Sequence, residues 1–225
     1  MATGMVVKWT VIAFVVIACI GFVVLIALPV ILSGAIVGSA PTPLQLPQLT
    51  TGTMNTTPPS PDGVWIAGSG SLAGFRVEES FLLQSGIIVG QTSAVSGSLV
   101  ISHNEISSGS FQVDLSKVTL GKQNVSFSEI LDTNKYPNAT LELTAPVSLT
   151  NIPTSGQAVS SSATGSLTMN GITQPVTFTF TGRYDGAVIE ATGSAPILVS
   201  DWGIESPFAV HNNAVIEFLV VLRRG

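Results

Sequence analysis

The sequence predicts an all-β domain, built as an antiparallel sandwich or a closed barrel of about eight strands, that follows a single transmembrane helix. Residues 62–225 contain several short segments in which apolar and polar side chains alternate, which is typical of half-buried strands. Glycine and Ser/Thr clusters separate these segments at regular intervals, as turns do in antiparallel folds. Before them, residues 9–32 form an uncharged apolar run long enough to cross a bilayer.

The apolar run begins at Trp9 and ends at Leu32. A helix of this length, at about 1.5 Å per residue, spans the ~30 Å hydrocarbon core with some tilt. The apolar part of a cleaved signal peptide has only about 7–15 residues. A cut after Gly38-Ser39-Ala40 would also leave Pro41 at the new terminus, which is a poor arrangement for cleavage. We therefore expect residues 9–32 to remain as an anchor.

The distribution of positive charge predicts how the anchor is oriented. Lys8 precedes it, and no lysine or arginine follows until Arg76. Because positive residues favour the cytoplasmic side, residues 1–8 are expected in the cytoplasm and the chain after residue 33 outside the cell membrane. This is the arrangement of a single-pass membrane protein with an extracytoplasmic C-terminal domain.

Cys19 is the sole cysteine of the chain and lies within the apolar run. Val16-Ile17-Ala18-Cys19 resembles a lipidation signal, but the residues that follow stay apolar up to Leu32. A small residue buried in the membrane is the favoured interpretation. The outer part of the chain cannot form an internal disulfide and must be stabilised by its own core.

Residues 33–61 are interpreted as a linker between the anchor and a domain that spans residues 62–225. Residues 41–61 contain six prolines, six threonines and no charged side chain. Proline fixes φ and removes a hydrogen-bond donor, so this composition favours an extended spacer.

Six segments of the domain alternate well enough to be predicted as strands. They are residues 96–101, 108–115, 140–147, 176–184, 187–198 and 214–224. One short helix is expected at residues 126–137, where Ser126 and Glu129 have capping-box spacing and Pro137 marks the end. Both faces of residues 214–224 are rather apolar, which predicts contacts on both sides of this strand and favours a closed sheet.

A tight hairpin is predicted at residues 166–180, because Asn170-Gly171 suits the positive φ angles of a two-residue type I′ turn. The turn pairs Met169 with Ile172, and it fixes the register of the two strands. One face then carries Leu167, Met169, Ile172, Val176, Phe178 and Phe180, and the other carries the threonine pairs Thr168–Thr173 and Thr164–Thr177. A barrel of about eight strands is either filled by its own side chains or holds one small ligand, and periodicity leaves both open.

No catalytic constellation is evident in the sequence. His103 and His211 are isolated from each other, have no cysteine partner in the outer domain and so predict no zinc site. Neither a Gly-x-Ser-x-Gly elbow nor a phosphate-binding loop is present, and the acidic residues are scattered singly. The domain is net acidic with dispersed positive residues, which argues against binding to nucleic acid. We expect a protein that is not an enzyme and needs no cofactor.

Several motifs follow one another in order along residues 64–224. They are the Trp-containing strand and Ser-x-x-x-Phe-x-Val element of VWIAGSGSLAGFRVEES, the strand GSFQVDLSKV, the Tyr-Pro-x-Ala-Thr motif of ILDTNKYPNATLEL, the segment GSLTMNGITQPV (165–176) and the turn SDWGIESP (200–207). In this order they resemble the YceI-like family of lipocalin-like β-barrels that bind polyisoprenoid lipids. The chain departs from the family where an Arg/Asp-rich segment often precedes the helical insert, since only LGKQNVSFSE stands there. Many members are soluble periplasmic proteins with a cleaved signal, whereas this chain carries a predicted anchor. A bacterial host is inferred from the resemblance.

The resemblance implies a lipocalin-like barrel whose interior holds an isoprenoid chain or a quinone. Burial contributes roughly 0.8 kcal/mol per CH₂ group, so a dry tunnel could hold such a chain with few polar contacts. The candidate lining residues are Phe75, Phe111, Leu141, Leu143, Leu167, Met169, Phe178, Phe180 and Phe218. Ordinary core packing explains the same residues equally well. Trp202, Phe208 and His211 are candidates for the mouth of the tunnel, and simple anchoring of the loop is the alternative for Trp202 and Phe208.

The leading hypothesis is a membrane-tethered extracytoplasmic protein that transports, stores or sequesters an isoprenoid lipid or similar amphiphile. The first alternative is a non-catalytic interaction module, in which a filled barrel presents its loops to another envelope protein. The second is an enzyme acting on a lipid, with His211 as its candidate residue. The sequence leaves homodimerisation open, together with the identity of the lipid.

Overall fold

The computed structural model describes residues 42–48, 59–81, 84–120, 123–126, 131–149, 156–205 and 210–225. The predicted anchor at residues 9–32 lies outside these ranges. Within them, no helix is long and apolar enough to cross a membrane.

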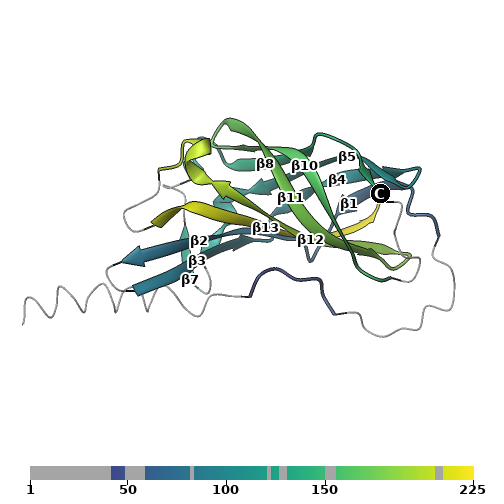
Figure 1. The fold of residues 1–225 in the computed structure, drawn as a ribbon, viewed down its shortest axis with the longest axis horizontal. Coiled ribbons are helices and arrows are strands. Elements are labelled where there is room, and N and C mark those ends of the chain that lie inside the picture. The colour runs from purple at the N-terminus through teal and green to yellow at the C-terminus, as the bar shows by residue number, and fades with distance from the viewer. Residues whose placement is uncertain are drawn as a thin grey trace, which may run out of the picture. The chain divides into compact units, whose positions relative to one another are not determined.

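The described elements are antiparallel strands and two short 3₁₀ helices (Figure 1). In chain order they are β1 (Gly63–Ala67), β2 (Leu72–Phe81), β3 (Gln84–Thr92), β4 (Val95–Ser102), β5 (Glu105–Asp114), η1 (Leu115–Lys117), β6 (Thr119–Leu120), β7 (Gln123–Ser126), β8 (Asn138–Leu143), β9 (Val147–Ser148), β10 (Val159–Met169), β11 (Ile172–Tyr184), β12 (Val188–Leu198), η2 (Val199–Trp202) and β13 (Val210–Arg224).

The sheet closes into a barrel because β1 pairs with two strands. It bonds to β4 on one side and to the C-terminal end of β13 on the other, where Trp65 lies opposite Arg224. The resulting ring of eight antiparallel strands runs β1-β4-β5-β8-β10-β11-β12-β13. The N-terminal part of β13 continues instead into β2, β3, β6 and β7. The prediction of a barrel is confirmed, and the sandwich is ruled out.

The predicted hairpin is confirmed residue by residue. Met169 pairs with Ile172 and Thr168 with Thr173, whose hydroxyl oxygens are 2.8 Å apart. Asn170 and Gly171 have φ angles of 49° and 73°, as a type I′ turn requires. Ile172 shares the apolar face by register but lies at the tip of the hairpin and is exposed.

The expected helix at residues 126–137 is not found in the part of that segment that the structure describes. Residues 131–135 form turns, and the backbone N–H groups of Lys135 and Tyr136 both donate to the carbonyl oxygen of Asp132. Asp132 has a positive φ of 44°, a left-handed conformation that a right-handed helix cannot continue through. Residues 127–130 lie outside the described ranges.

Part of the predicted linker lies against the outer wall of the barrel. The N–H of Leu44 donates to the Glu217 carboxylate (2.9 Å), and the Thr192 hydroxyl donates to the carbonyl oxygen of Leu44 (2.9 Å). Further along, the Arg183 guanidinium donates to the carbonyl oxygen of Pro47. Residues 42–48, here called the strap, are therefore bonded to β11, β12 and β13 and do not form a free spacer.

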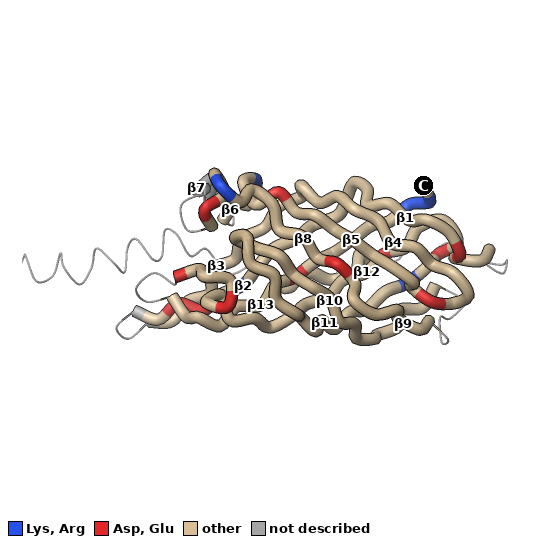
Figure 2. Tube along the Cα trace, turned by 90° about the horizontal axis from the view of Figure 1, so that it is seen from above, with Lys and Arg blue, Asp and Glu red and all other residues tan. Residues whose placement is uncertain are grey.

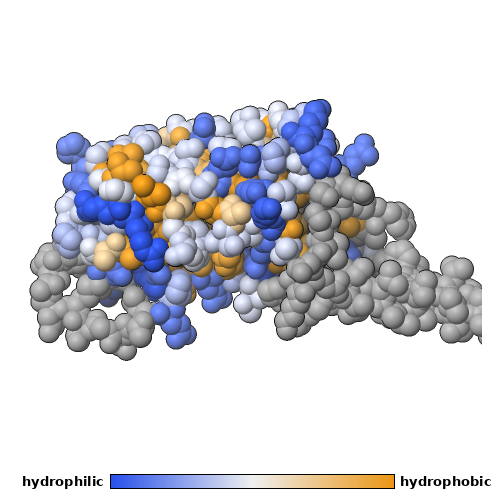
Figure 3. Space-filling model, turned by 180° about the vertical axis from the view of Figure 1, so that it is seen from behind, coloured by the Kyte–Doolittle hydropathy of each residue, from blue (hydrophilic) through white to orange (hydrophobic). Residues whose placement is uncertain are grey.

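The outward face of β13 is buried at several positions, as its apolar composition predicted. Glu217 is 6% exposed and forms an ion pair with Arg76 of β2, next to the strap. Nearer the C-terminus, the Ser71 hydroxyl accepts from the N–H of Val221 (3.0 Å), which fixes the β1–β2 turn on this strand. The face seen in Figure 3 is mixed in character, with orange apolar residues set among paler and blue ones.

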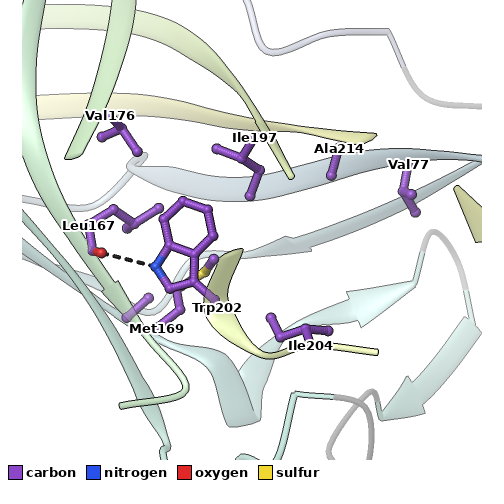
Figure 4. Close-up of a cluster of buried hydrophobic side chains, with 9 residues drawn as sticks. Val77, Leu167, Met169, Val176, Ile197, Trp202, Ile204 and Ala214 are labelled. Carbon is purple, nitrogen blue, oxygen red and sulfur yellow. Dashed lines mark hydrogen bonds between the residues drawn. The ribbon is translucent and has the colours of Figure 1, made fainter. Parts of the chain in front are cut away.

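Two clusters of buried side chains lie towards opposite ends of the barrel, each around a tryptophan. One contains Trp65, Leu222 and Tyr184. The other contains Trp202, Leu167 and neighbouring residues of β10, β11 and β12 (Figure 4). The barrel is thus well packed towards both ends, and what lies between the clusters decides whether the interior is full.

Candidate functional site

The barrel interior holds two adjoining cavities with volumes of about 230 Å³ and 140 Å³. Together these volumes fall in the ~300–1,000 Å³ range of ligand pockets. The two cavities share six lining residues, so they adjoin within one apolar interior. The shared residues are Ala73, Val113, Ala139, Leu141, Leu167 and Phe218.

All nine residues predicted to face a tunnel line these cavities. Phe75 and Met169 line the larger cavity, whereas Leu141, Leu167 and Phe218 line both. The remaining four line the smaller cavity, namely Phe111, Leu143, Phe178 and Phe180. Strand alternation therefore identified the inward-facing side chains, while any contact with a ligand remains a prediction.

The burial of these residues shows that the interior is not filled. Leu167 and Met169 are buried, at 5% and 8% exposure. The other seven of the nine are only half-buried although they point into the barrel. Large apolar side chains in a filled core would lose nearly all of their accessible surface. Their remaining surface faces the cavities.

Two glycines of the barrel wall leave room for phenylalanine rings. Gly193 of β12 lies opposite Phe218, and a Cβ atom at this glycine would be 2.5 Å from the Cζ atom of the ring. Gly90 of β3 lies opposite Phe75, whose ring would overlap a Cβ atom there. Each phenylalanine ring therefore occupies the space that the side chain of any residue larger than glycine would fill at the opposite position.

The phenylalanines of the smaller cavity contact one another in β11 and β13. The ring of Phe178 makes an edge-to-face contact with Phe218, with centroids 5.8 Å apart, and lies 6.2 Å from Phe180. Such contacts add to the stability gained from burial alone. They hold the aromatic wall in place without closing the space beside it.

The larger cavity has polar side chains at one end. Glu205 and His211 line it there, and both are exposed. The His211 ring has Nε2 3.0 Å from the Ser80 hydroxyl oxygen and Nδ1 3.7 Å from a carboxylate oxygen of Glu78. His211 thus lies at the exposed edge of the cavity, and its place at the mouth of a lipid tunnel stays a prediction.

Of the two roles considered for Trp202, the structure favours anchoring of the loop. It lines neither cavity and is 2% exposed, and its indole N–H donates to the carbonyl oxygen of Leu167 (3.0 Å; Figure 4). It therefore anchors η2 to β10 and does not gate the mouth. Phe208, the third residue predicted there, lies outside the described residues.

The structure adds lining residues that sequence reasoning did not single out. Ile197 and Ile216 lie on the inward faces of β12 and β13, so alternation could have found them. Leu115, Val118 and Leu131 belong to η1 and to connecting segments, where no periodic signal exists. These three close the cavity beside β5 and β8.

The described residues offer no evident catalytic or metal centre. No group of three His, Cys, Asp or Glu side chains among them is placed to hold a metal ion. His103 lies exposed in the β4–β5 turn with a φ of 54°. The arrangement of the cavities suits reversible binding of an apolar molecule.

Comparison with known proteins identifies a YceI-like domain at residues 66–222. No curated protein matches the chain significantly. Similar solved structures include a polyisoprenoid-binding domain from Saccharophagus degradans (TM-score 0.58, 14% identity, 72% of this chain and 99% of that one). Others are BcnA from Burkholderia cenocepacia (0.51, 21%, 67% and 95%) and the YceI protein of Campylobacter jejuni (0.53, 15%, 65% and 91%). At these identities the likeness establishes the fold.

Proposed function

This chain belongs to the YceI-like family, and from that membership and its apolar interior we propose that it holds an isoprenoid lipid or a similar amphiphile inside the barrel. The observation that carries the proposal is the half-buried state of the inward-facing phenylalanines beside the two adjoining cavities. The Saccharophagus degradans neighbour, described as a polyisoprenoid-binding domain, supports the same ligand class. The role is transport, storage or sequestration of the lipid.

We further propose that residues 9–32 anchor the protein in a bacterial cell membrane, with residues 1–8 in the cytoplasm and the barrel outside. The uncharged apolar run and the position of Lys8 support this. Alkaline extraction of membranes should leave the full chain in the pellet, and protease added to spheroplasts should digest the barrel. Release of the chain by alkali would contradict the anchor.

Lipid binding is tested by filling the cavity of the full-length protein. Ala191 lines the smaller cavity and is half-buried, so Ala191→Phe should occupy the ligand's space. Leu141 lies between both cavities, and Leu141→Trp should act similarly. Lipids that co-purify with each protein are extracted and quantified per mole of protein by mass spectrometry. Both variants should lose the lipid that the wild type carries.

The matched control is Thr177→Phe, which places the same ring on the exposed outer face of β11. Its lipid content should equal that of the wild type. Thermal unfolding of all four proteins shows whether a loss of lipid reflects filling or misfolding. A wild-type protein without any stoichiometric lipid, even after incubation with isoprenoid lipids, would refute the proposal.

The two alternatives make different predictions for the same protein. An interaction module with a filled barrel would tolerate no added ring at Ala191 but would carry no lipid. An enzyme acting on the lipid would need a titratable group at the cavity, where His211 is a candidate. His211→Ala should leave lipid chemically unchanged, as in the wild type, if the protein only binds it.

A further inference from the structure

The polar lining residues of the larger cavity indicate where the head group of a bound amphiphile would lie. Its polar lining residues are Thr92, Glu205, His211 and Glu217. Glu217 is already bonded to Arg76 and the strap on the outer wall, and the Thr92 hydroxyl oxygen accepts from the N–H of Ala94 (3.1 Å). The remaining two, Glu205 and His211, are both exposed and mark the rim of the cavity. An apolar tail in the tunnel therefore places its head group there.

The rim is rich in carboxylates. A carboxylate oxygen of Glu78 lies 3.7 Å from Nδ1 of His211. The next residue of β2, Glu79, pairs with Val210 of β13, which precedes His211 in the chain. Glu205 lines the cavity itself, so acidic residues of β2 and of the segment after η2 belong to this end of the barrel. Acidic residues are visible along β2 at this end of the barrel (Figure 2).

No lysine or arginine lines either cavity in the described part of the chain. Lys117 and Lys135, which follow β5 and precede β8, contribute to neither lining. Arg183 lines a third cavity of about 180 Å³ towards the opposite end. Its guanidinium is bonded to Glu190 and to the carbonyl oxygen of Pro47 on the outer wall. A negatively charged head group would therefore meet no free described cation along the tunnel.

These observations decide which head groups the rim accepts. A phosphate placed beside the carboxylates would lose hydration and gain repulsion, since neither is compensated by a positive partner. A hydroxyl could donate a hydrogen bond to a carboxylate, which is an acceptor when ionised. We propose that the rim of the larger cavity selects an isoprenoid with an uncharged, hydroxyl-bearing head group and rejects its phosphate ester. This inference rests on the proposed lipid-binding function.

The test compares an isoprenoid alcohol with its monophosphate ester of identical chain length. Both compete with the radiolabelled alcohol for delipidated full-length protein in neutral detergent micelles. The alcohol should compete at a concentration about tenfold lower than the phosphate, which corresponds to about 1.4 kcal/mol. Raising the salt concentration should reduce this difference, because ions screen the repulsion at an exposed rim.

Two variants locate the source of the selectivity. Glu205→Lys should strengthen binding of the phosphate and weaken binding of the alcohol, so that the preference for the alcohol falls or reverses. Glu142→Gln removes a carboxylate from the exposed outer face of β8 and should behave as the wild type does.

The outcomes separate this inference from the proposed function. Equal binding of the two lipids, or tighter binding of the phosphate, would overturn the head-group inference while lipid binding stands. Loss of phosphate binding in Arg183→Gln would place the head group at the opposite end and overturn it as well. If neither lipid competes, both the proposed function and this inference fail.

Discussion

The two ends of the barrel are each built around a tryptophan, and they differ in what the tryptophan connects. Trp65 is 0% exposed and its indole N–H donates to the carbonyl oxygen of Pro61 (2.7 Å). Its ring makes an edge-to-face contact with Tyr184, with centroids 5.5 Å apart, and lies 5.1 Å from the Arg224 guanidinium carbon. Because β1 pairs with both β4 and β13 and so closes the ring of strands, these contacts stabilise the closure of the barrel, here called the seam.

Trp202 stabilises a single turn and not the closure of the sheet. It belongs to η2, a single 3₁₀ turn after β12, and its indole bonds to a carbonyl group of β10. Gly203 follows with a φ of 65° and ends the turn. Ile204 and Glu205, which lie two and three residues beyond Trp202, line the larger cavity. The comparison shows that one end holds the barrel closed while the other positions the rim of the cavity.

The largest effect is expected at the seam. Trp65→Ala removes a fully buried indole and should lower the free energy of unfolding by about 3–5 kcal/mol. The reason is the cavity it leaves, together with the lost contacts to Tyr184 and Arg224. Chemical denaturation of the full-length protein measures the change. A loss below 1 kcal/mol would show that strand pairing alone keeps the barrel closed.

A smaller and more selective effect is expected from Trp202→Phe. The variant leaves the Leu167 carbonyl oxygen without the indole N–H, at a cost of about 1–3 kcal/mol. It should also lower the lipid content, because Leu167 and Met169 line the cavity next to this contact. Trp65→Phe is the matched control, since it loses a similar bond at a residue that lines neither cavity. Equal lipid content in both variants would contradict the division between the two ends.

The features of the fold that the sequence predicts are those set by interactions between residues close together in the chain. The Asn170-Gly171 hairpin is local, so turn chemistry and alternation gave its register. The inward-facing residues also followed from alternation, because successive strand side chains point to opposite faces. The open space beside them did not, since it depends on which glycines lie opposite Phe75 and Phe218 in the closed sheet.

The mistaken expectations all concern segments outside the regular strands. Trp202 is placed by a carbonyl group 35 residues earlier in the chain, which no local pattern indicates. The strap has the composition of a spacer, and the side chains that bond it belong to strands far along the sequence. At residues 131–135 the capping-box spacing predicted a helix, whereas the left-handed Asp132 gives turns.

The smallest effect is expected from a comparison of the β4–β5 and β10–β11 turns. Asn170 and Asn104 both have left-handed φ angles, of 49° and 60°, in turns at opposite ends of the barrel. Replacing either by alanine should cost about 1 kcal/mol for the backbone conformation. The Asn170 amide also donates to the carbonyl oxygen of Trp202 (3.0 Å), which ties the hairpin to η2.

Asn170→Ala should therefore lower the free energy of unfolding by about 1 kcal/mol more than Asn104→Ala does, which is the net value of one hydrogen bond. It should also lower the lipid content slightly, because η2 leads into the rim residue Glu205. Parallel denaturation and lipid analysis of the two variants measure both differences. If the two variants lose the same free energy of unfolding and carry the same amount of lipid, the indole of Trp202 alone positions η2. The Asn170 amide then contributes nothing to the position of η2.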